Sequence, residues 1–230
     1  MKLALISDIH SNLFAFEAVI SRIPSHDYLL CLGDVVGYGP RPNEVIEKLV
    51  ALQPKLTLMG NHDYAVTTGN TSGFTLHAAQ AIEWTRRHIN QKNMKYLSEL
   101  LPSARLRLGG KIFALYHGSP RDPLTEYIYP ALSKTEARQL IKSAEADVVL
   151  LGHTHVPMVY VSQNEMLANP GSVGQPRDGN RRASFAVLTI SDRNISIAIE
   201  RVDYDVDSVA REIRRVGLPQ RLADRLYTGL

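Results

Sequence analysis

The stretch TLMGNHDYAV, residues 57–66, changes from apolar to strongly polar side chains within a few positions. The apolar residues up to Met59 predict the end of a buried strand. An amide, an imidazole and a carboxylate follow at once, at Asn61, His62 and Asp63. A core strand that ends in three such groups indicates a functional site at its carboxyl end.

Four other apolar runs also end in polar side chains. The groups that follow the five runs are Asp8 and His10; Asp34; Asn61, His62 and Asp63; His117; and His153 and His155. In parallel sheets, ligands bind outside the carboxyl ends of the strands, so these groups predict one shared pocket. The first and last pairs each join residues two positions apart, and in extended backbone such side chains point the same way. Each pair is therefore expected to aim two ligand atoms at one point.

The order of the predicted elements indicates two sheets. Apolar runs alternate with amphipathic stretches in the first part of the chain, which favours a parallel sheet. Later, Gly109-Gly110 and residues 191–194 are expected to close two hairpins. The predicted strands are 3–6, 28–32, 56–59, 105–108, 111–116, 147–151, 158–161, 185–190 and 195–202, and the predicted helices are 13–23, 43–52, 75–90, 94–101, 133–143 and 206–216. This strand content is high for one doubly wound sheet. We find no repeat or linker and expect a single domain over residues 1–230.

Composition excludes several classes of protein. The chain has 26 Lys and Arg against 23 Asp and Glu, and a net charge of +3 is too small to argue for nucleic acid. Its one cysteine, Cys31, cannot form an intramolecular disulfide. The apolar start, residues 3–6, is too short for a signal peptide, and no apolar run approaches the roughly 18 residues of a membrane span. We expect a soluble, cytoplasmic protein that does not act in a membrane.

The chemistry of the polar groups favours divalent metal ions. Oxygen and nitrogen ligands without sulfur disfavour a structural zinc site and suit open coordination of ions such as Mn, Fe or Zn. The Asp34 carboxylate is the natural bridge between two ions because it has two oxygens. Two metals about 3.5–4 Å apart can hold both the attacking and the leaving oxygen of a phosphoryl displacement. Four positive charges against the two carboxylates, Asp8 and Asp34, leave a surplus that favours an anion such as a phosphate ester.

Five motifs in this order resemble the calcineurin-like metallophosphoesterase superfamily. They are DIH at 8–10, GD at 33–34, GNHD at 60–63, HG at 117–118 and GHTH at 152–155. The resemblance covers almost the whole chain. It implies an α/β fold, a four-layer α/β/β/α sandwich of two mixed β-sheets flanked by helices, which also accommodates the high strand content.

The resemblance also implies roles for individual residues. One divalent metal would be held by Asp8, His10, Asp34 and His155, and a second by Asp34, Asn61, His117 and His153. A water or hydroxide between the ions would be the nucleophile. His62 would be the catalytic histidine, which donates a hydrogen bond or proton to the phosphate or the leaving group, and Asp63 would orient it. Manganese is the expected metal, with iron, zinc, cobalt or nickel as alternatives.

Three longer stretches narrow the resemblance to small prokaryotic predicted phosphodiesterases. They are GDVVGYGPRPNEV at 33–45, HGSPRDP at 117–123 and NPGSVGQPRDG at 169–179. Ser/Thr phosphatases and symmetrical diadenosine tetraphosphatases typically continue the second motif as GDxxDRG, whereas residues 37–39 here are Gly-Tyr-Gly. The phosphate-clamping arginine of those enzymes is therefore missing.

Substrate contacts are expected from Asn61 and from Arg121 or Arg177, either of which can replace the missing arginine. The segment 64–74, rich in Thr, Gly and Asn, is a candidate substrate lid. The remaining histidines, His26, His77 and His88, are expected to be surface or packing residues.

We expect a metal-dependent phosphoric ester hydrolase, most simply a phosphodiesterase acting on a small phosphate ester or nucleotide. Three alternatives stay open: a phosphomonoesterase or protein phosphatase, a nuclease acting on DNA or RNA, and a non-catalytic scaffold such as the retromer subunit of this superfamily. The sequence also leaves open whether the chain forms a homo-oligomer.

Overall fold

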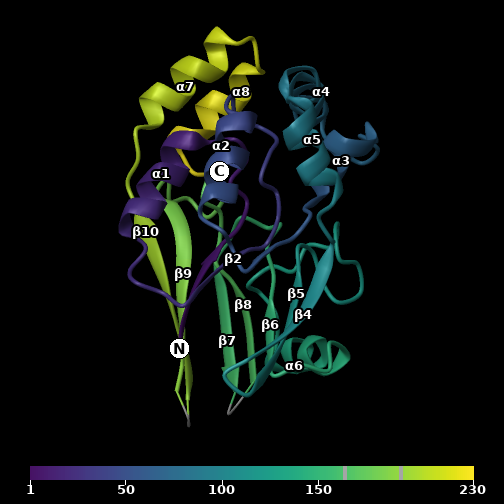
Figure 1. Ribbon diagram of the computed structural model, residues 1–230, viewed down its shortest axis with the longest axis vertical. Coiled ribbons are helices and arrows are strands. Elements are labelled where there is room, and N and C mark those ends of the chain that lie inside the picture. Colours follow the sequence, from purple (N-terminus) through teal and green to yellow (C-terminus); the bar gives the residue numbers. More distant parts are fainter. Residues whose placement is uncertain (163–164, 192–193) are drawn as a thin grey trace.

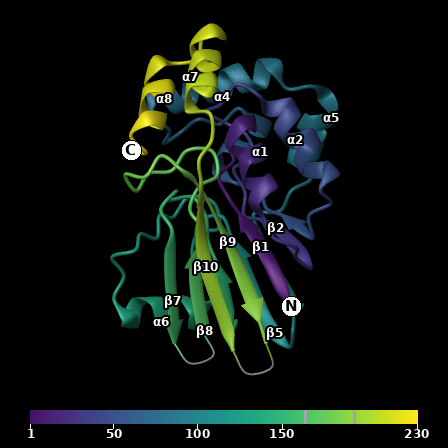
Figure 2. The same cartoon turned by 90° about the vertical axis from the view of Figure 1, so that its left-hand side faces the viewer.

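Two mixed β-sheets of five strands each form the centre of the molecule, and helices cover their outer faces (Figures 1 and 2). The computed structural model describes residues 1–162, 165–191 and 194–230. Its strands are β1 (Lys2–Ile6), β2 (Tyr28–Cys31), β3 (Leu56–Thr57), β4 (Ser103–Leu108), β5 (Lys111–Tyr116), β6 (Val148–Leu150), β7 (Met158–Ser162), β8 (Glu165–Asn169), β9 (Ala183–Ile190) and β10 (Ile195–Val202). Its helices are α1 (Leu13–Arg22), α2 (Pro42–Ala51), α3 (Asn61–Thr68), α4 (Leu76–His88), α5 (Gln91–Ser98), α6 (Lys134–Ser143), α7 (Val206–Arg215), α8 (Gln220–Asp224) and the 3₁₀ turn η1 (Arg225–Tyr227).

The first sheet has the order β10-β9-β1-β2-β3. Strands β1, β2 and β3 are parallel, as the alternation of strands and helices predicts, and β9 and β10 are antiparallel. The three parallel strands end at one edge, where the polar residues that follow them meet. The hairpin predicted after Ile190 is confirmed by the pairing of Ile190 with Ile195, although residues 192–193 of its turn lie outside the described residues.

The second sheet has the order β4-β5-β6-β8-β7. The predicted hairpin of β4 and β5 is confirmed, and Gly109 and Gly110 turn it with φ angles of 54° and 75°. Strands β5, β6 and β8 are parallel, so their carboxyl ends also share an edge. We did not predict β8. Its apolar run is only Met166 to Ala168, too short to be recognised without its two neighbouring strands.

Side-chain alternation along the strands builds the layers. In β1, Leu3 and Leu5 pack between the two sheets, whereas Ala4 and Ile6 face the helices. The buried residues between the sheets are Leu3, Leu5, Leu30, Leu32, Leu58, Leu108, Phe113, Leu115, Val148, Leu150, Met166, Ala168, Ala186, Leu188 and Ile190. These residues come from both sheets and confirm the predicted two-sheet core.

The covering helices are unevenly distributed. Helices α1 and α2 pack on the first sheet through residues such as Phe16 and Ile46, and α6 packs on the second through Leu140 and Ile141. Helices α7 and α8 lie with α1 at one end of the molecule, far from α6 (Figures 1 and 2). No helix in the described parts of the chain is both long and apolar enough to cross a membrane.

The segment expected to be a loop over residues 64–74 begins as a helix. Helix α3 extends to Thr68. Its start is capped by the Asp63 carboxylate, which accepts a hydrogen bond from the N–H of Gly60. It ends at Gly69, which has a φ of 81° and donates its N–H to the Ala65 carbonyl. The rest of the segment leads to α4 without regular structure. A second omission is the C-terminal α8 with η1, which follows the predicted final helix.

Candidate metal centre

The seven predicted metal ligands converge at the shared carboxyl ends of the strands of the two sheets. Two groups of side chains can each surround an ion: Asp8, His10, Asp34 and His155, and Asp34, His117 and His153. Within each group, one ligand atom from every residue lies within 4.8 Å of the others. All of these residues are buried, and Asp34 belongs to both groups. Asn61 joins the second group, because its Oδ1 lies 3.1 Å from the Nε2 of His117.

The two-residue spacing led us to expect extended backbone at these positions, but the structure differs. Asp8, His10, Asp34, His153 and His155 all have positive φ angles, between 49° and 67°. Residues other than glycine rarely adopt this left-handed conformation, and such strain is concentrated at functional sites. The chain therefore turns sharply as it leaves each strand, and this turn directs the side chains to one point.

Main-chain carbonyl groups fix the orientation of the imidazole rings. The Nδ1 atoms of His10, His117 and His155 lie 3.1, 2.8 and 2.5 Å from carbonyl oxygens. A carbonyl can only accept, so Nδ1 carries a proton and Nε2 is the atom that faces the site. On His10 and His155 this Nε2 has a free lone pair, because burial holds the pKa of both rings well below its usual value. His153 is held the other way round, because its Nε2 lies 3.1 Å from the carbonyl oxygen of Thr125, which leaves Nδ1 for the site.

Three buried carboxylate oxygens have no hydrogen-bond partner among the described residues: both oxygens of Asp8 and Oδ2 of Asp34. Oδ2 of Asp34 lies 3.5 Å from the Nε2 of His10 and 3.3 Å from the Nε2 of His117. The other oxygen of Asp34 accepts a hydrogen bond of 2.8 Å from the main-chain N–H of His62. The same oxygen atom, Oδ2, therefore lies beside both groups of ligands, whereas Oδ1 is engaged by the main chain.

The electrostatics of the site fit cations. Burial raises the pKa of Asp8 to about 7, against the favourable charge of His117, so its ionised form needs positive charge nearby. Burial alone would lower the pKa of His117, but the Asp34 carboxylate raises it to about 9. Buried carboxylates without hydrogen bonds, facing imidazole lone pairs, match the oxygen and nitrogen donors that divalent metal ions prefer.

Two glycines allow the backbone to approach the ligands. A Cβ atom on Gly60 would lie 2.0 Å from Oδ1 of Asp34 and 2.3 Å from its main-chain nitrogen. A Cβ atom on Gly37 would lie 2.7 Å from Nδ1 of His62 and 2.9 Å from Nδ1 of His10. The ligands therefore leave no room for a side chain at these two positions.

His62 and Asp63 lie in the first turn of helix α3. We expected Asp63 to orient His62, but their side chains form no hydrogen bond with each other. The Asp63 carboxylate accepts hydrogen bonds of 2.9, 3.0 and 3.2 Å from the N–H groups of Gly60, Val36 and Val35. The buried Nδ1 of His62 has no partner in the described residues. Asp63 therefore ties the 60–63 turn to the loop after β2, and it does not orient the His62 ring.

Aromatic residues surround the His62 ring. The ring centroids of Tyr38 and Phe74 lie 4.4 and 4.9 Å from that of His62. Burial lowers the pKa of His62 to about 4, so its imidazole is neutral near pH 7. A neutral ring can accept a proton at one nitrogen and donate one at the other.

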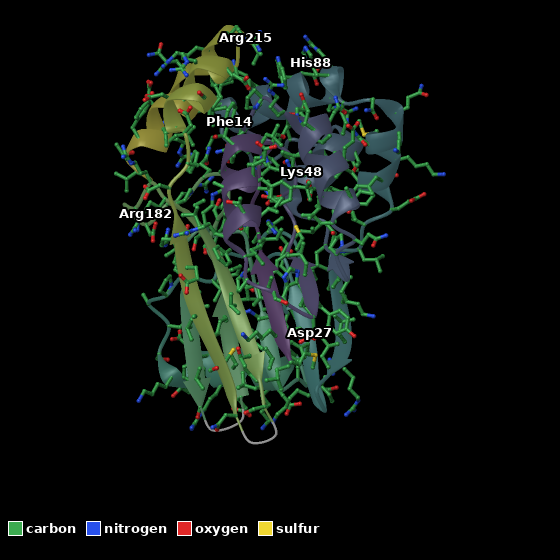
Figure 3. All side chains as sticks on the ribbon, turned by 60° about the vertical axis from the view of Figure 1, so that its left-hand side comes forward. Phe14, Asp27, Lys48, His88, Arg182 and Arg215 are labelled. Atoms are coloured by element: carbon green, nitrogen blue, oxygen red, sulfur yellow. The ribbon has the colours of Figure 1, made fainter. Side chains whose placement is uncertain are left out.

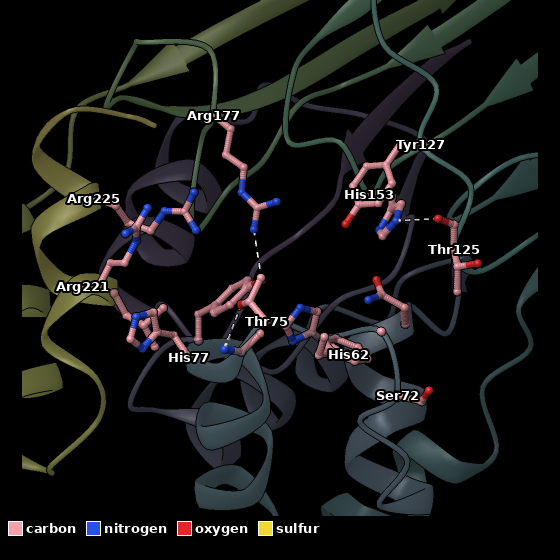
Figure 4. Close-up of a pocket in the computed structure, with 16 residues that line it drawn as sticks. His62, Ser72, Thr75, His77, Thr125, Tyr127, His153, Arg177, Arg221 and Arg225 are labelled. Atoms are coloured by element: carbon pink, nitrogen blue, oxygen red, sulfur yellow. Dashed lines mark hydrogen bonds between the residues drawn. The ribbon is translucent and has the colours of Figure 1, made fainter.

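A cavity of about 730 Å³ opens beside the metal ligands (Figure 4). Asn61, His62 and His153 line one part of it, and Arg177 reaches into it from the loop after β8. Arg121 does not line this cavity. Its side chain is 63% exposed and pairs with Glu126, so only one of the two candidate arginines lies at the site.

Several residues of the cavity were not predicted. They are Tyr38, His77, Tyr127, Arg221 and Arg225, whereas Ser72, Gly73 and Phe74 belong to the segment 64–74 that we named as a candidate lid. His77 lines the cavity although we expected it to be a surface or packing residue. Tyr38, the residue found where related phosphatases have arginine, was a signal in the sequence, and its hydroxyl accepts a hydrogen bond of 3.1 Å from Nη2 of Arg177.

Comparison with known proteins agrees with this arrangement. Residues 1–193 match the family model described as the calcineurin-like phosphoesterase superfamily domain. The chain is 35% identical to protein MJ0912 of Methanocaldococcus jannaschii, over 99% of this chain and 98% of that protein. It is 30% identical to the phosphodiesterase YfcE of Escherichia coli, over 82% of this chain and 87% of YfcE.

Solved structures show the same fold. The crystal structure of a metallophosphoesterase from Sphaerobacter thermophilus has a TM-score of 0.84 and 34% identity, and covers 100% of this chain and 99% of its own. Protein PH1004 from Pyrococcus horikoshii has a TM-score of 0.89 at 21% identity over 100% and 98% of the two chains, a likeness of fold alone. The sequence match, the two sheets and the buried ligand groups agree that this chain belongs to the calcineurin-like phosphoesterase superfamily.

Proposed function

We propose that the protein is a phosphodiesterase with two divalent metal ions, most simply Mn²⁺. The observation that carries the proposal is the position of the buried Oδ2 of Asp34. It has no hydrogen-bond partner among the described residues and lies within 3.5 Å of the Nε2 atoms of both His10 and His117. One oxygen within reach of both ligand groups would allow the Asp34 carboxylate to contact two ions.

When bound, two such ions supply Lewis acidity for the phosphoryl group and lower the pKa of the attacking water. The residues of the chain position the rest of the reaction. His62 begins a helix whose first turn is fixed by Asp63, and its buried neutral imidazole faces the cavity. From there its N–H donates a hydrogen bond to the leaving oxygen. Arg177 presents its guanidinium to the phosphoryl oxygens, a contact for which arginine is suited.

Two features favour a diester over a monoester. A diester carries less charge than a monoester and a second substituent, and Tyr38 replaces the phosphate-clamping arginine of related phosphatases. The aromatic residues Phe74 and Tyr127 line the cavity and can pack against that substituent. YfcE, which is 30% identical, is named a phosphodiesterase.

Hydrolysis of bis(p-nitrophenyl) phosphate with Mn²⁺ tests the proposal. We expect His62→Gln to lower kcat by about 10²–10⁴-fold, the usual contribution of general acid–base catalysis. Elemental analysis should find the same metal content in the variant and the unmodified protein. His26→Gln, an exposed histidine whose Nδ1 contacts the Pro24 carbonyl, is the matched control and should retain activity.

Each other outcome favours an alternative. Full activity of His62→Gln would remove this residue from the mechanism. Faster hydrolysis of p-nitrophenyl phosphate would indicate a phosphomonoesterase, and comparable cleavage of single-stranded DNA would indicate a nuclease. Absence of activity with Mn, Fe, Zn, Co or Ni on any of these esters would favour a non-catalytic scaffold.

A further inference from the structure

The cavity extends well beyond the metal ligands, to the C-terminal helices. Figure 4 shows Arg221 and Arg225 together on one side, His62 and His153 on the other, and Arg177 reaching in between. Arg221 lies in α8 and Arg225 begins η1. Three arginines from two distant segments of the chain therefore meet one cavity whose metal ligands lie to one side.

No carboxylate among the described residues lines this cavity. The nearby acids pair with other arginines instead: Asp224 with Arg214, Asp178 with Arg201, and Glu212 with Arg41. No Asp or Glu side chain in the described parts of the chain pairs with the three arginines of the cavity. A bound anion is the remaining partner for them.

The contacts of these arginines leave donors available. Nη2 of Arg177 binds two neutral acceptors, the hydroxyl of Tyr38 and Oε1 of Gln175, each at 3.1 Å, and its buried Nε has no partner in the described residues. Arg225 donates its Nε to the main-chain oxygen of Leu230 at 2.7 Å, so its terminal nitrogens remain. No hydrogen bond of the Arg221 guanidinium is found within residues 1–162, 165–191 and 194–230.

The charges are close enough to affect one another. Burial, together with the charges of Arg177 and Arg221, lowers the pKa of Arg225 to about 10. Like charges held together in a partly buried position oppose folding unless an anion compensates them. The cluster therefore carries an electrostatic cost that ligand binding would relieve.

We propose that Arg221 and Arg225, with Arg177 beside them, form a second anion subsite that binds a phosphate group of the substrate other than the one hydrolysed. This inference rests on the proposed phosphodiesterase activity. The substrate class is a small phosphodiester that carries an additional phosphomonoester, such as a nucleotide ester phosphorylated at a second position. Arginine forks match the geometry of phosphate oxygens, which accounts for the choice of side chain.

The dimensions and walls of the cavity agree with a substrate of this kind. A volume of about 730 Å³ lies within the range of small-molecule sites. Tyr127, which is 49% exposed, packs against His153 with ring centroids 3.9 Å apart and offers an aromatic surface beside the metal ligands (Figure 4). In the reaction, water adds to the phosphorus of the diester, the bond to the leaving oxygen breaks, and that oxygen takes the proton. The distal phosphate is unchanged.

Two esters of one leaving group test the subsite. They are thymidine 5′-(p-nitrophenyl phosphate) and the same compound with a 3′-phosphate. We expect the 3′-phosphate to lower KM by about tenfold or more in the unmodified protein, as charge-assisted hydrogen bonds do. The double variant Arg221→Gln with Arg225→Gln keeps most of the side-chain volume and should bring the ratio of the two KM values close to one.

Arg215→Gln is the matched control, because Arg215 is an exposed arginine of α7 that does not line the cavity (Figure 3). It should preserve the difference between the two esters. Two results would overturn the subsite while leaving the proposed phosphodiesterase activity intact. One is equal KM values for the two esters in the unmodified protein, and the other is a double variant whose KM rises by the same factor for both esters.

A binding measurement separates the two proposals. If neither ester is hydrolysed, calorimetry with thymidine 3′,5′-bisphosphate and thymidine 5′-monophosphate, on protein supplied with Mn²⁺, decides the matter. Tighter binding of the bisphosphate that disappears in the double variant would support the subsite although the proposed activity had failed. Equal affinities would overturn it.

Discussion

The Nε2 atoms of His10 and His155 face each other at 3.0 Å, although the residues lie 145 positions apart in the chain. Both rings are turned by carbonyl groups that hold Nδ1, so two lone pairs point into the same space. Nε2 of His155 also lies 3.3 Å from Oδ1 of Asp8. This geometry is unfavourable in the absence of a proton or cation between the atoms, and a divalent ion satisfies all three.

Metal binding should therefore stabilise the fold. At a free Mn²⁺ concentration about 100 times the Kd, the free energy of unfolding should rise by about 2.7 kcal/mol. For a chain of this length we expect an increase in Tm of about 5–10 °C, measured by thermal unfolding after EDTA treatment with and without added Mn²⁺.

The increase should become much smaller in His155→Ala and persist in His26→Ala, the exposed control. A Tm that is independent of Mn²⁺, Fe²⁺ and Zn²⁺ would contradict the assignment of these residues as metal ligands.

Gly60 is expected to be essential because of the space around it rather than its conformation. Its φ of −93° suits any residue, but an added Cβ would meet the main-chain nitrogen of Asp34 at 2.3 Å. Gly60→Ala should therefore displace the Asp34 carboxylate, lower the free energy of unfolding by about 1–3 kcal/mol and abolish the Tm increase with Mn²⁺.

Gly217→Ala is the contrasting variant. Gly217 has a φ of 77° after α7, and nothing lies within 4 Å of its added Cβ. We expect a loss of stability of about 1–2 kcal/mol from the left-handed conformation alone, with an undiminished response to Mn²⁺. Equal metal responses in the two variants would show that the contact at Gly60 is unimportant.

The sequence was sufficient to predict that the seven candidate metal ligands come together. Apolar runs that end in Asp, His or Asn mark the carboxyl ends of strands, and the order of elements places these ends at shared edges of the sheets. The two-sheet architecture was predictable from the number of strands, which is high for one doubly wound sheet. The left-handed backbone at Asp8 and His155 was not, because Asp and His adopt a positive φ more often than most residues but still at only a small share of their positions.

Other features depend on contacts that sequence spacing does not contain. The family resemblance led us to expect that Asp63 orients His62, but consecutive residues of a helix do not face each other, and α3 includes both. Arg221 and Arg225 lie in a C-terminal stretch where basic and acidic residues are interspersed, a pattern typical of a solvated surface. Only the packing of α8 beside Tyr38 brings them to the cavity.

Arg177 should contribute to substrate affinity through its planar guanidinium. Lysine retains the charge but cannot contact both the Tyr38 hydroxyl and a phosphate oxygen through a rigid fork. We expect Arg177→Lys to lower kcat/KM for bis(p-nitrophenyl) phosphate by about tenfold, mainly through KM, in steady-state assays. Arg182→Lys, at an exposed position of the same loop, is the control. Identical kinetics of the two variants would exclude a substrate contact by Arg177.

The ion pair of Arg41 and Glu212 joins the start of α2 to α7. Nε of Arg41 donates to Oε2 of Glu212 at 2.8 Å, and Nη2 contacts the second oxygen. The Arg41 side chain is 34% exposed and that of Glu212 is 16% exposed, so solvent screens the pair in part. Hydrogen bonds from Arg41 hold the pKa of Glu212 below its ordinary value.

This shift has a defined sign. Because the pKa is lower in the folded state, the unfolded chain binds more protons over this range, and stability rises with pH. The contribution is complete above about pH 4.3, the usual pKa of an unfolded glutamate, and is lost as the pH falls through the folded value. After allowance for solvent screening, we expect Glu212→Gln to lower the free energy of unfolding at pH 7 by about 1 kcal/mol.

Urea unfolding at pH 7 and at pH 3 measures this difference. It should shrink at pH 3, because the unfolded glutamate binds a proton below about pH 4.3 and the ionised carboxylate then contributes less to stability. Glu83→Gln removes an ion pair with Arg87 in which both partners are more than half exposed, and it should cost less than about 0.5 kcal/mol at either pH. If Glu212→Gln lowered the free energy of unfolding equally at both pH values, the loss would come from packing or from neutral hydrogen bonds. Only an interaction of the ionised carboxylate depends on pH.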